Sequence, residues 1–323
     1  MRPARRRLAF AAQLALAAGV LWFAGRAIAA QWEAVRSAAV EVRPNWGSIA
    51  VSGVVVLAAY ALLIEIWRGT LGIWGARLPF RDAAHVWFVS NLGRYVPGKL
   101  WQIGAMGVMA QRRGVAPAAA VGSALLLTLV NIAVGFAIVF ATGGQVLEAS
   151  GAGRQTTTVG ALATVAIILL LLAMPAVLPH VSGVIRQVTG RELTLPTVPA
   201  RAVWLATVGN AAAWLLYGLA FQLLARGVLG RPTGDWLGYT AVYTGSYLVG
   251  YLVLFAPGGL VFREAAMVAA LVRLGLTTAP EAALLAVASR LWLTVLEIVP
   301  GVLFMAFAAA RPAPPNSPRN VSP

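Results

Sequence analysis

Long apolar runs separated by short polar segments dominate the chain. A membrane-spanning helix needs roughly 17–25 mostly apolar residues, and six runs are long enough. They cover residues 8–30, 47–67, 117–142, 158–178, 202–225 and 280–310. Because the backbone of a segment in lipid must satisfy its own hydrogen bonds, this pattern predicts an all-α fold. We expect a polytopic membrane helical bundle with about six full spans.

The first run, residues 8–30, allows two interpretations. An arginine-rich start, an apolar stretch and the ending Ala27-Ile28-Ala29 are typical of a cleavable signal peptide. The apolar stretch is also as long as a spanning helix, and more apolar runs follow it. We therefore favour a retained first helix.

Two further stretches, residues 83–113 and 236–275, each consist of two shorter helical pieces joined at a Pro-Gly break. The piece before Pro97 is too short and too polar to cross a membrane alone, so the first stretch is predicted to be a re-entrant hairpin. The second stretch, which breaks at Pro257, fits either a re-entrant hairpin or two full spans.

The two breaks begin similar successions of landmarks. In each, Pro-Gly is followed by a glycine, then a proline, then a long apolar run. These landmarks are Pro97-Gly98, Gly114 and Pro117 in one case, and Pro257-Gly258, Gly275 and Pro280 in the other. We interpret them as an inverted repeat, with one unit at about 83–142 and the other at about 236–310, an architecture common in transporters. The alternative is chance recurrence of Pro-Gly in membrane helices.

Composition supports one membrane domain, residues 1–310, followed by a proline-rich, disordered tail, residues 311–323. The chain is 60% hydrophobic and only 11% charged, against roughly 25% charged residues in soluble domains. The net charge of +15 comes from arginines at the ends of apolar runs, which does not fit nucleic-acid binding. With no cysteine and only two distant histidines, no metal site or other cofactor is expected.

Charge placement also predicts orientation. If both hairpins return to the side from which they start, and the N-terminus is cytoplasmic, about twice as many arginines lie on the cytoplasmic side as outside, as the positive-inside rule requires. The C-terminus is then cytoplasmic as well.

The breaks carry the candidate chemistry. A helix that begins after Pro-Gly leaves backbone N–H groups and a positive dipole end at the break, which favours an anion. Arg94 and Lys99 flank the first break, and charges at membrane depth normally face the bundle interior. The candidate binding residues are Arg94, Pro97, Gly98, Lys99, Pro257, Gly258, Gly259, Arg263, Glu264, Arg290 and Glu297.

Two features near the second break have alternative interpretations. Arg263–Glu264 and Arg290–Glu297 could be internal ion pairs that only hold the helices in place. Tyrosines recur every four residues along one helix face, which is typical of packing but could also line a polar path. They are Tyr239, Tyr243, Tyr247 and Tyr251.

The segments NLGRYVPGKLW and APGGLVFREA, at this separation in a polytopic chain, resemble the flippase-like lysylphosphatidylglycerol synthase transmembrane family. The resemblance covers roughly residues 8–310. The matching residues are Asn91, Arg94, Pro97, Gly98, Lys99, Pro257, Gly258, Gly259, Arg263 and Glu264. Val261 departs from the pattern, because the family often has glycine there. The resemblance implies a bacterial cytoplasmic membrane protein that translocates or handles a lipid without a soluble synthase domain.

The leading hypothesis is therefore a flippase-like transporter of an anionic membrane lipid or lipid-linked glycan. An enzyme, such as a membrane glycosyltransferase acting on polyprenyl-phosphate-linked sugars, is less favoured because no acidic cluster supplies a base or a metal site. A subunit that docks a partner synthase and a transporter of small anions are the remaining alternatives.

Overall fold

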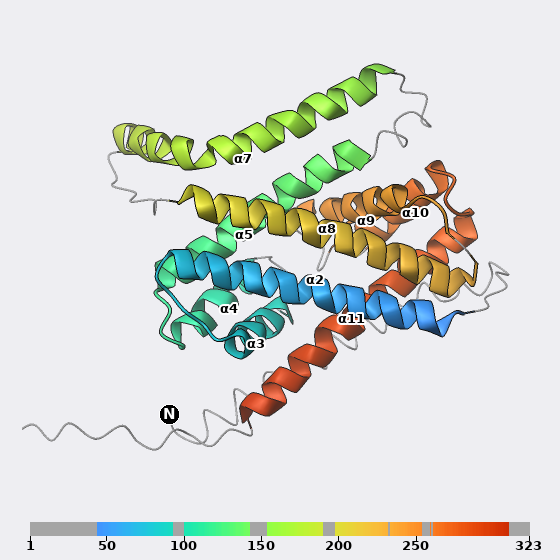
Figure 1. Cartoon of the computed structure of the whole chain (residues 1–323), viewed down its shortest axis with the longest axis horizontal. Coiled ribbons are helices and arrows are strands. Elements are labelled where there is room, and N and C mark those ends of the chain that lie inside the picture. The colour runs from blue at the N-terminus through green and yellow to red at the C-terminus, as the bar shows by residue number, and fades with distance from the viewer. Residues whose placement is uncertain are drawn as a thin grey trace, which may run out of the picture.

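Helices account for all the regular structure in the part of the chain that the structure describes. The computed structural model describes residues 44–92, 100–142, 154–189, 198–231, 233–253, 259 and 261–309. Its helices are α2 (Trp46–Ile73), α3 (Phe80–Asn91), α4 (Leu100–Gln111), α5 (Pro117–Thr142), α7 (Arg154–Thr189), α8 (Ala200–Leu229), α9 (Trp236–Leu252), α10 (Phe262–Arg273) and α11 (Ala279–Ala309) (Figure 1). The all-α prediction is confirmed. The expected first span at 8–30 and the tail at 311–323 lie outside the described residues.

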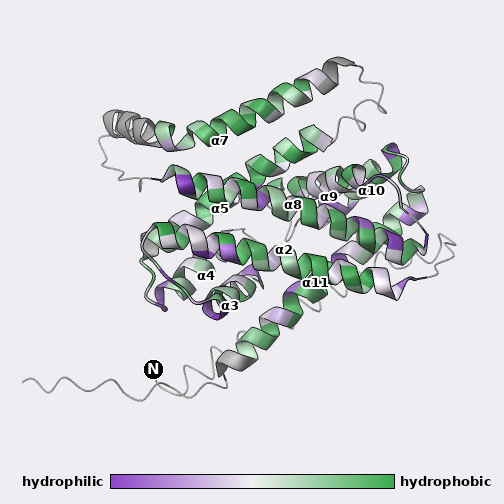
Figure 2. Cartoon of the chain, viewed as in Figure 1, coloured by the Kyte–Doolittle hydropathy of each residue, from purple (hydrophilic) through white to green (hydrophobic). Residues whose placement is uncertain are grey.

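Five helices within the described ranges are long and apolar enough to cross a membrane. Their apolar segments are Trp46–Ile73, Ala119–Thr142, Thr158–Val177, Ala200–Leu229 and Ala279–Ala306. These correspond to five of the six predicted runs, although several helices extend beyond the apolar run by a turn or more. Figure 2 shows hydrophobic residues along these helices and hydrophilic residues mainly near helix ends and in loops. The chain therefore forms a polytopic helical membrane bundle.

Helices α2 and α8 form the antiparallel centre of the bundle. Near one end, Gly69 of α2 faces Leu205 of α8; near the other, Gly227 of α8 lies against Ile49 of α2. Between them, a Cβ on Gly209 would come within 2.1 Å of an Ile66 side-chain atom. Small residues let helix backbones approach closely, which is the main way helices associate in lipid.

The two broken helix pairs start from opposite ends of this centre. Helix α3 follows the C-terminal end of α2, and α9 follows the C-terminal end of α8. Because α2 and α8 are antiparallel, these two ends lie on opposite sides of the bundle. Within each pair the short helices pack on each other, α3 with α4 and α9 with α10.

The same capped turn follows each pair. Helices α4 and α10 each have 12 residues, and left-handed Gly114 (φ +84°) and Gly275 (φ +62°) follow them. In both turns the residue after the glycine donates its N–H back five positions, over 3.2 Å at Val115 and 3.1 Å at Leu276. This is the Schellman cap, which only glycine adopts at low cost. The turn leads into α5 in one case and into α11 in the other.

Helices of 12 residues are about 18 Å long, whereas the hydrocarbon core of a bilayer is about 30 Å thick. None of α3, α4 and α10 can therefore cross a bilayer alone. Helix α9 is longer, with 17 residues, which is the lower end of the length of a spanning helix. Re-entrant topology and the inverted repeat stay predictions.

Helix α7 packs on α5 and α8, and Figure 1 shows it at the edge of the bundle. Only 11% of its most apolar stretch, within Thr158–Val177, is buried by the protein. In a membrane protein such a face is covered by lipid.

Candidate functional site

A cavity of about 120 Å³, lined by both polar and apolar side chains, lies inside the bundle. Every described helix except α7 contributes to its lining. The lining is rich in tyrosine, tryptophan and side-chain amides, with one arginine and one glutamate. A single water needs about 10–15 Å³ measured in this way, so the cavity holds much more than one water. Ionisable residues inside a membrane bundle are costly and mark candidate functional sites.

Residues next to both breaks meet at this cavity. Asn91, the last residue of α3, and Gln102, in the first turn of α4, line it from the first break. Tyr251 of α9 and Arg263 of α10 line it from the second. Gln102 Nε2 donates a hydrogen bond to Asn91 Oδ1, which links the two sides of the first break.

The predicted site residues fall into three groups. Arg263 and Glu297 line the cavity. Gly259, Glu264 and Arg290 lie in the surrounding structure, described below. The remaining six lie outside the described residues: Arg94, Pro97, Gly98, Lys99, Pro257 and Gly258.

Arg263 is a buried cation held against aromatic rings. It is only 7% exposed, and its guanidinium carbon lies 5.2 Å from the Tyr243 ring centroid and 5.5 Å from that of Tyr247. A desolvated cation–π contact stabilises by about 2 kcal/mol. Within the described ranges, its Nη2 atom is buried without a hydrogen-bond partner. Arg263 therefore keeps a donor that no described protein group uses.

Two carboxylates anchor α11 to its neighbours. Glu264 Oε1 on α10 lies 3.8 Å from Arg290 Nη1 on α11, with both side chains largely buried. Neither oxygen of Glu264 has a hydrogen-bond partner among the described residues. Glu297 accepts a 2.9 Å hydrogen bond from the Tyr60 hydroxyl on α2. The ion pair between Glu264 and Arg290 joins two helices, and the sequence did not predict it.

Gly259, just after the second break, lies directly against the backbone of α9. Gly259 has φ +70°, and a Cβ there would lie 2.5 Å from Gly250 O of α9. Val261, two residues later, has φ +72° and ψ −50°, a strained γ-turn conformation for a β-branched residue. Its side chain is 66% exposed, so glycine at this position would relieve backbone strain rather than allow close packing.

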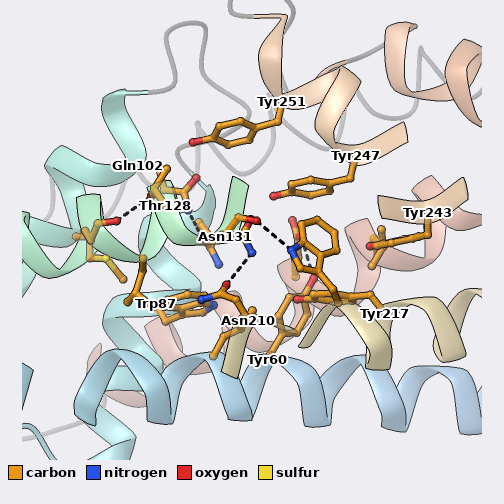
Figure 3. A pocket seen from close by; sticks show the side chains of 18 of the residues that line it. Tyr60, Trp87, Gln102, Thr128, Asn131, Asn210, Tyr217, Tyr243, Tyr247 and Tyr251 are labelled. Carbon is orange, nitrogen blue, oxygen red and sulfur yellow. Dashed lines mark hydrogen bonds between the residues drawn. The ribbon is translucent and has the colours of Figure 1, made fainter. Parts of the chain in front are cut away.

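One half-buried and one buried amide, Asn131 and Asn210, form a network that the sequence did not predict. Asn131 Nδ2 of α5 donates to Asn210 Oδ1 of α8 over 2.8 Å, and Asn210 Nδ2 donates to Ala206 O over 2.7 Å (Figure 3). Trp214 Nε1 donates to Asn131 O over 3.1 Å. The available signal was a single asparagine in the middle of each of two apolar runs.

The tyrosine face divides between the two interpretations. Tyr243, Tyr247 and Tyr251 line the cavity. Tyr239 is buried, with its ring centroid 5.7 Å from that of Phe221. Three of the four tyrosines therefore line the cavity, and Tyr243 both lines it and packs on Phe221.

No group of three or more histidine, cysteine, aspartate or glutamate side chains within the described ranges could hold a metal ion. The cavity can instead hold the polar part of a ligand by hydrogen bonds, one cation and aromatic contacts.

An all-helical bundle with membrane-spanning helices and an internal cavity defines a multi-pass membrane protein. The family model for the lysylphosphatidylglycerol synthase TM region matches residues 10–301, and the chain belongs to this family. Among curated proteins, none matches the chain.

Proposed function

We propose that the protein is a flippase-like transporter that moves a lipid with an anionic, phosphate-bearing head group between the two leaflets. The observation that carries the proposal is that residues next to both breaks line one and the same cavity. Transporters with broken helices bind their substrates where such breaks meet. Family membership supports a role in lipid handling.

In the proposed mechanism the head group enters the cavity while the acyl or prenyl chains stay in lipid. Arg263 supplies a cation, and its unused Nη2 donor is available to a phosphate oxygen. Lys99 and Arg94 are proposed to contribute from the first break, together with helix N-termini. The two repeat units, which start from opposite ends of the bundle, would alternately open the cavity to each side.

Reconstituted liposomes test the proposal. A fluorescent phosphatidylglycerol in the inner leaflet should become accessible to an external quencher when the wild-type protein is present. Arg263→Gln and Lys99→Ala should each slow this transfer by about tenfold, because each removes a charge-assisted contact. Arg231→Gln is the matched control, because Arg231 pairs with Glu281 at the surface and is 49% exposed. Lipid that stays in its original leaflet with the wild-type protein would refute transport.

The proposal also includes a bacterial cytoplasmic membrane and cytoplasmic termini. The support is the arginine distribution along the chain. Cysteine accessibility checks it: a cysteine at Arg77 should resist a membrane-impermeant thiol reagent in intact cells, and one at Arg231 should react. The opposite pattern would reverse the orientation.

A further inference from the structure

The cavity lining has no excess of either charge within the described ranges. Arg263 is its one cation and Glu297 its one carboxylate. Arg263 lies against two tyrosine rings, and Glu297 accepts from Tyr60. Arg263 can meet one phosphate through its unused Nη2 donor, but a further ligand charge would be buried without compensation, which is costly. The rest of a ligand in this space should therefore be neutral.

The lining offers both donors and acceptors. Side-chain amides carry both, as do the hydroxyls of threonine and tyrosine. The amides are Asn91, Gln102, Asn131 and Asn210. A phosphate only accepts hydrogen bonds and an ammonium group only donates them, whereas an alcohol does both. Mixed donors and acceptors therefore match a ligand with several hydroxyl groups.

Part of this lining is held in place by contacts between helices. The bonds Asn131–Asn210 and Trp214–Asn131 tie α5 to α8, which fixes the Asn131 amide while its side-chain oxygen can still accept. Aromatic side chains share the lining with the amides, among them Trp87, Trp214 and Tyr217. Fixed polar groups beside ring surfaces suit a sugar, which has hydroxyl edges and apolar C–H faces.

A cationic head group fits less well. Ring faces of tyrosine attract cations, but those of Tyr243 and Tyr247 already carry the Arg263 guanidinium. A second cation would be repelled by Arg263 at the same place.

We infer that the cavity binds a neutral glycosyl group carried on the phosphate of the transported lipid. The inference rests on the proposed function and narrows its substrate to a glycosyl-phosphate lipid. We assign specificity for the sugar to Asn131 and Thr128, because they are the polar residues that α5 contributes to the cavity lining.

Titration calorimetry of the full-length protein in an amine-oxide detergent, which has neither sugar nor phosphate, tests the inference. The probes share one alkyl chain: an alkyl phosphate, a glucosyl alkyl phosphodiester, an alkyl glucoside and an alkyl phosphoethanolamine. Glucose 1-phosphate is the soluble probe. The glucosyl phosphodiester should bind about tenfold more tightly than the alkyl phosphate, as one or two extra hydrogen bonds would give.

Asn131→Leu should bind the glucosyl phosphodiester and the alkyl phosphate with about equal affinity, and its affinity for the alkyl phosphate should match that of the wild-type protein. Thr128→Val, which keeps the side-chain shape, should reduce it about threefold and covers the case in which loss of the Asn131–Asn210 bond unfolds the protein. Gln222→Leu is the matched control: this amide bonds to Gly234 O outside the cavity, so the preference should persist.

The outcomes separate the inference from the proposed function. Equal affinity for alkyl phosphate and glucosyl phosphodiester, or tighter binding of the phosphoethanolamine, overturns the sugar and leaves anionic lipid transport intact. Binding of the alkyl glucoside alone supports the sugar and overturns the anionic head group. Glucose 1-phosphate binding as tightly as the phosphodiester supports the sugar and overturns the lipid.

Discussion

The segment α3–α4–α5 and the segment α9–α10–α11 share a backbone plan but differ in chemistry. Both have two short helices, a Schellman-capped glycine turn and a long helix. Among the described residues, the first segment gives the cavity neutral amides, Asn91, Gln102 and Asn131. The second gives it tyrosines, Arg263 and Glu297. Two similar frameworks can therefore hold opposite sides of one site without matching side chains.

Their ion pairs differ as well. The pair Glu264–Arg290 in the second segment has side chains only 10% and 16% exposed. In the first segment, Asp82 and Arg113 are 30% and 23% exposed and lie 3.4 Å apart. Water screens the more exposed pair, Asp82–Arg113, more strongly, so this pair contributes less to stability. The second segment carries the buried charge and the strained backbone, and the first carries little of either in its described residues.

The largest expected effect on stability is at Gly259, just after the second break. Gly259→Ala should destabilise the protein by about 4 kcal/mol, since the new Cβ adds left-handed strain and a clash with the Gly250 backbone. Gly275→Ala is the control, because Gly275 is also left-handed but has no atoms within 4 Å of a Cβ position. It should cost about 1 kcal/mol. Unfolding free energies measured in bicelles check the difference, and equal costs would mean that the contact with α9 is absent.

The second-largest loss of stability is expected at the buried ion pair Glu264–Arg290. Glu264→Gln leaves Arg290 without its charged partner on α10, and removing one member of a buried pair costs about 3 kcal/mol. Asp82→Asn in the first segment should cost about 0.5 kcal/mol. The double variant Glu264→Gln, Arg290→Gln should recover part of the loss, because it removes the buried charge that has lost its partner on α10. A double variant as unstable as the sum of two single losses would exclude coupling between the two residues.

The sequence predicted the features that depend on local patterns. The lengths of the apolar runs predicted the five helices that could span a membrane. The landmarks Gly114 and Gly275 fall at the turns that follow α4 and α10. The placement of Arg263 and Glu297 at the cavity agrees with the expectation that charges at depth face the interior.

Contacts between helices far apart in the chain could not be predicted in this way. Asn131 and Asn210 are 79 residues apart, and each alone looks like a minor polar interruption of an apolar run. Glu264 has a cation directly beside it in sequence, Arg263, yet the ion pair described for it is with Arg290 on another helix. Helix rotation and register, which decide such pairings, depend on packing across the whole bundle.

The smallest effect has the opposite sign. Val261→Gly should stabilise the protein by about 1 kcal/mol, because glycine adopts φ +72° without the strain that a β-branched side chain brings. The gain is limited, since glycine also loses more backbone entropy on folding. Val272→Gly on the same helix is the control: Val272 is also partly exposed but helical, so the change should cost about 1 kcal/mol. Thermal unfolding of both variants in one detergent separates the two effects. If Val261→Gly destabilised the protein as much as Val272→Gly, residue 261 would not be left-handed, and α10 would begin before Phe262.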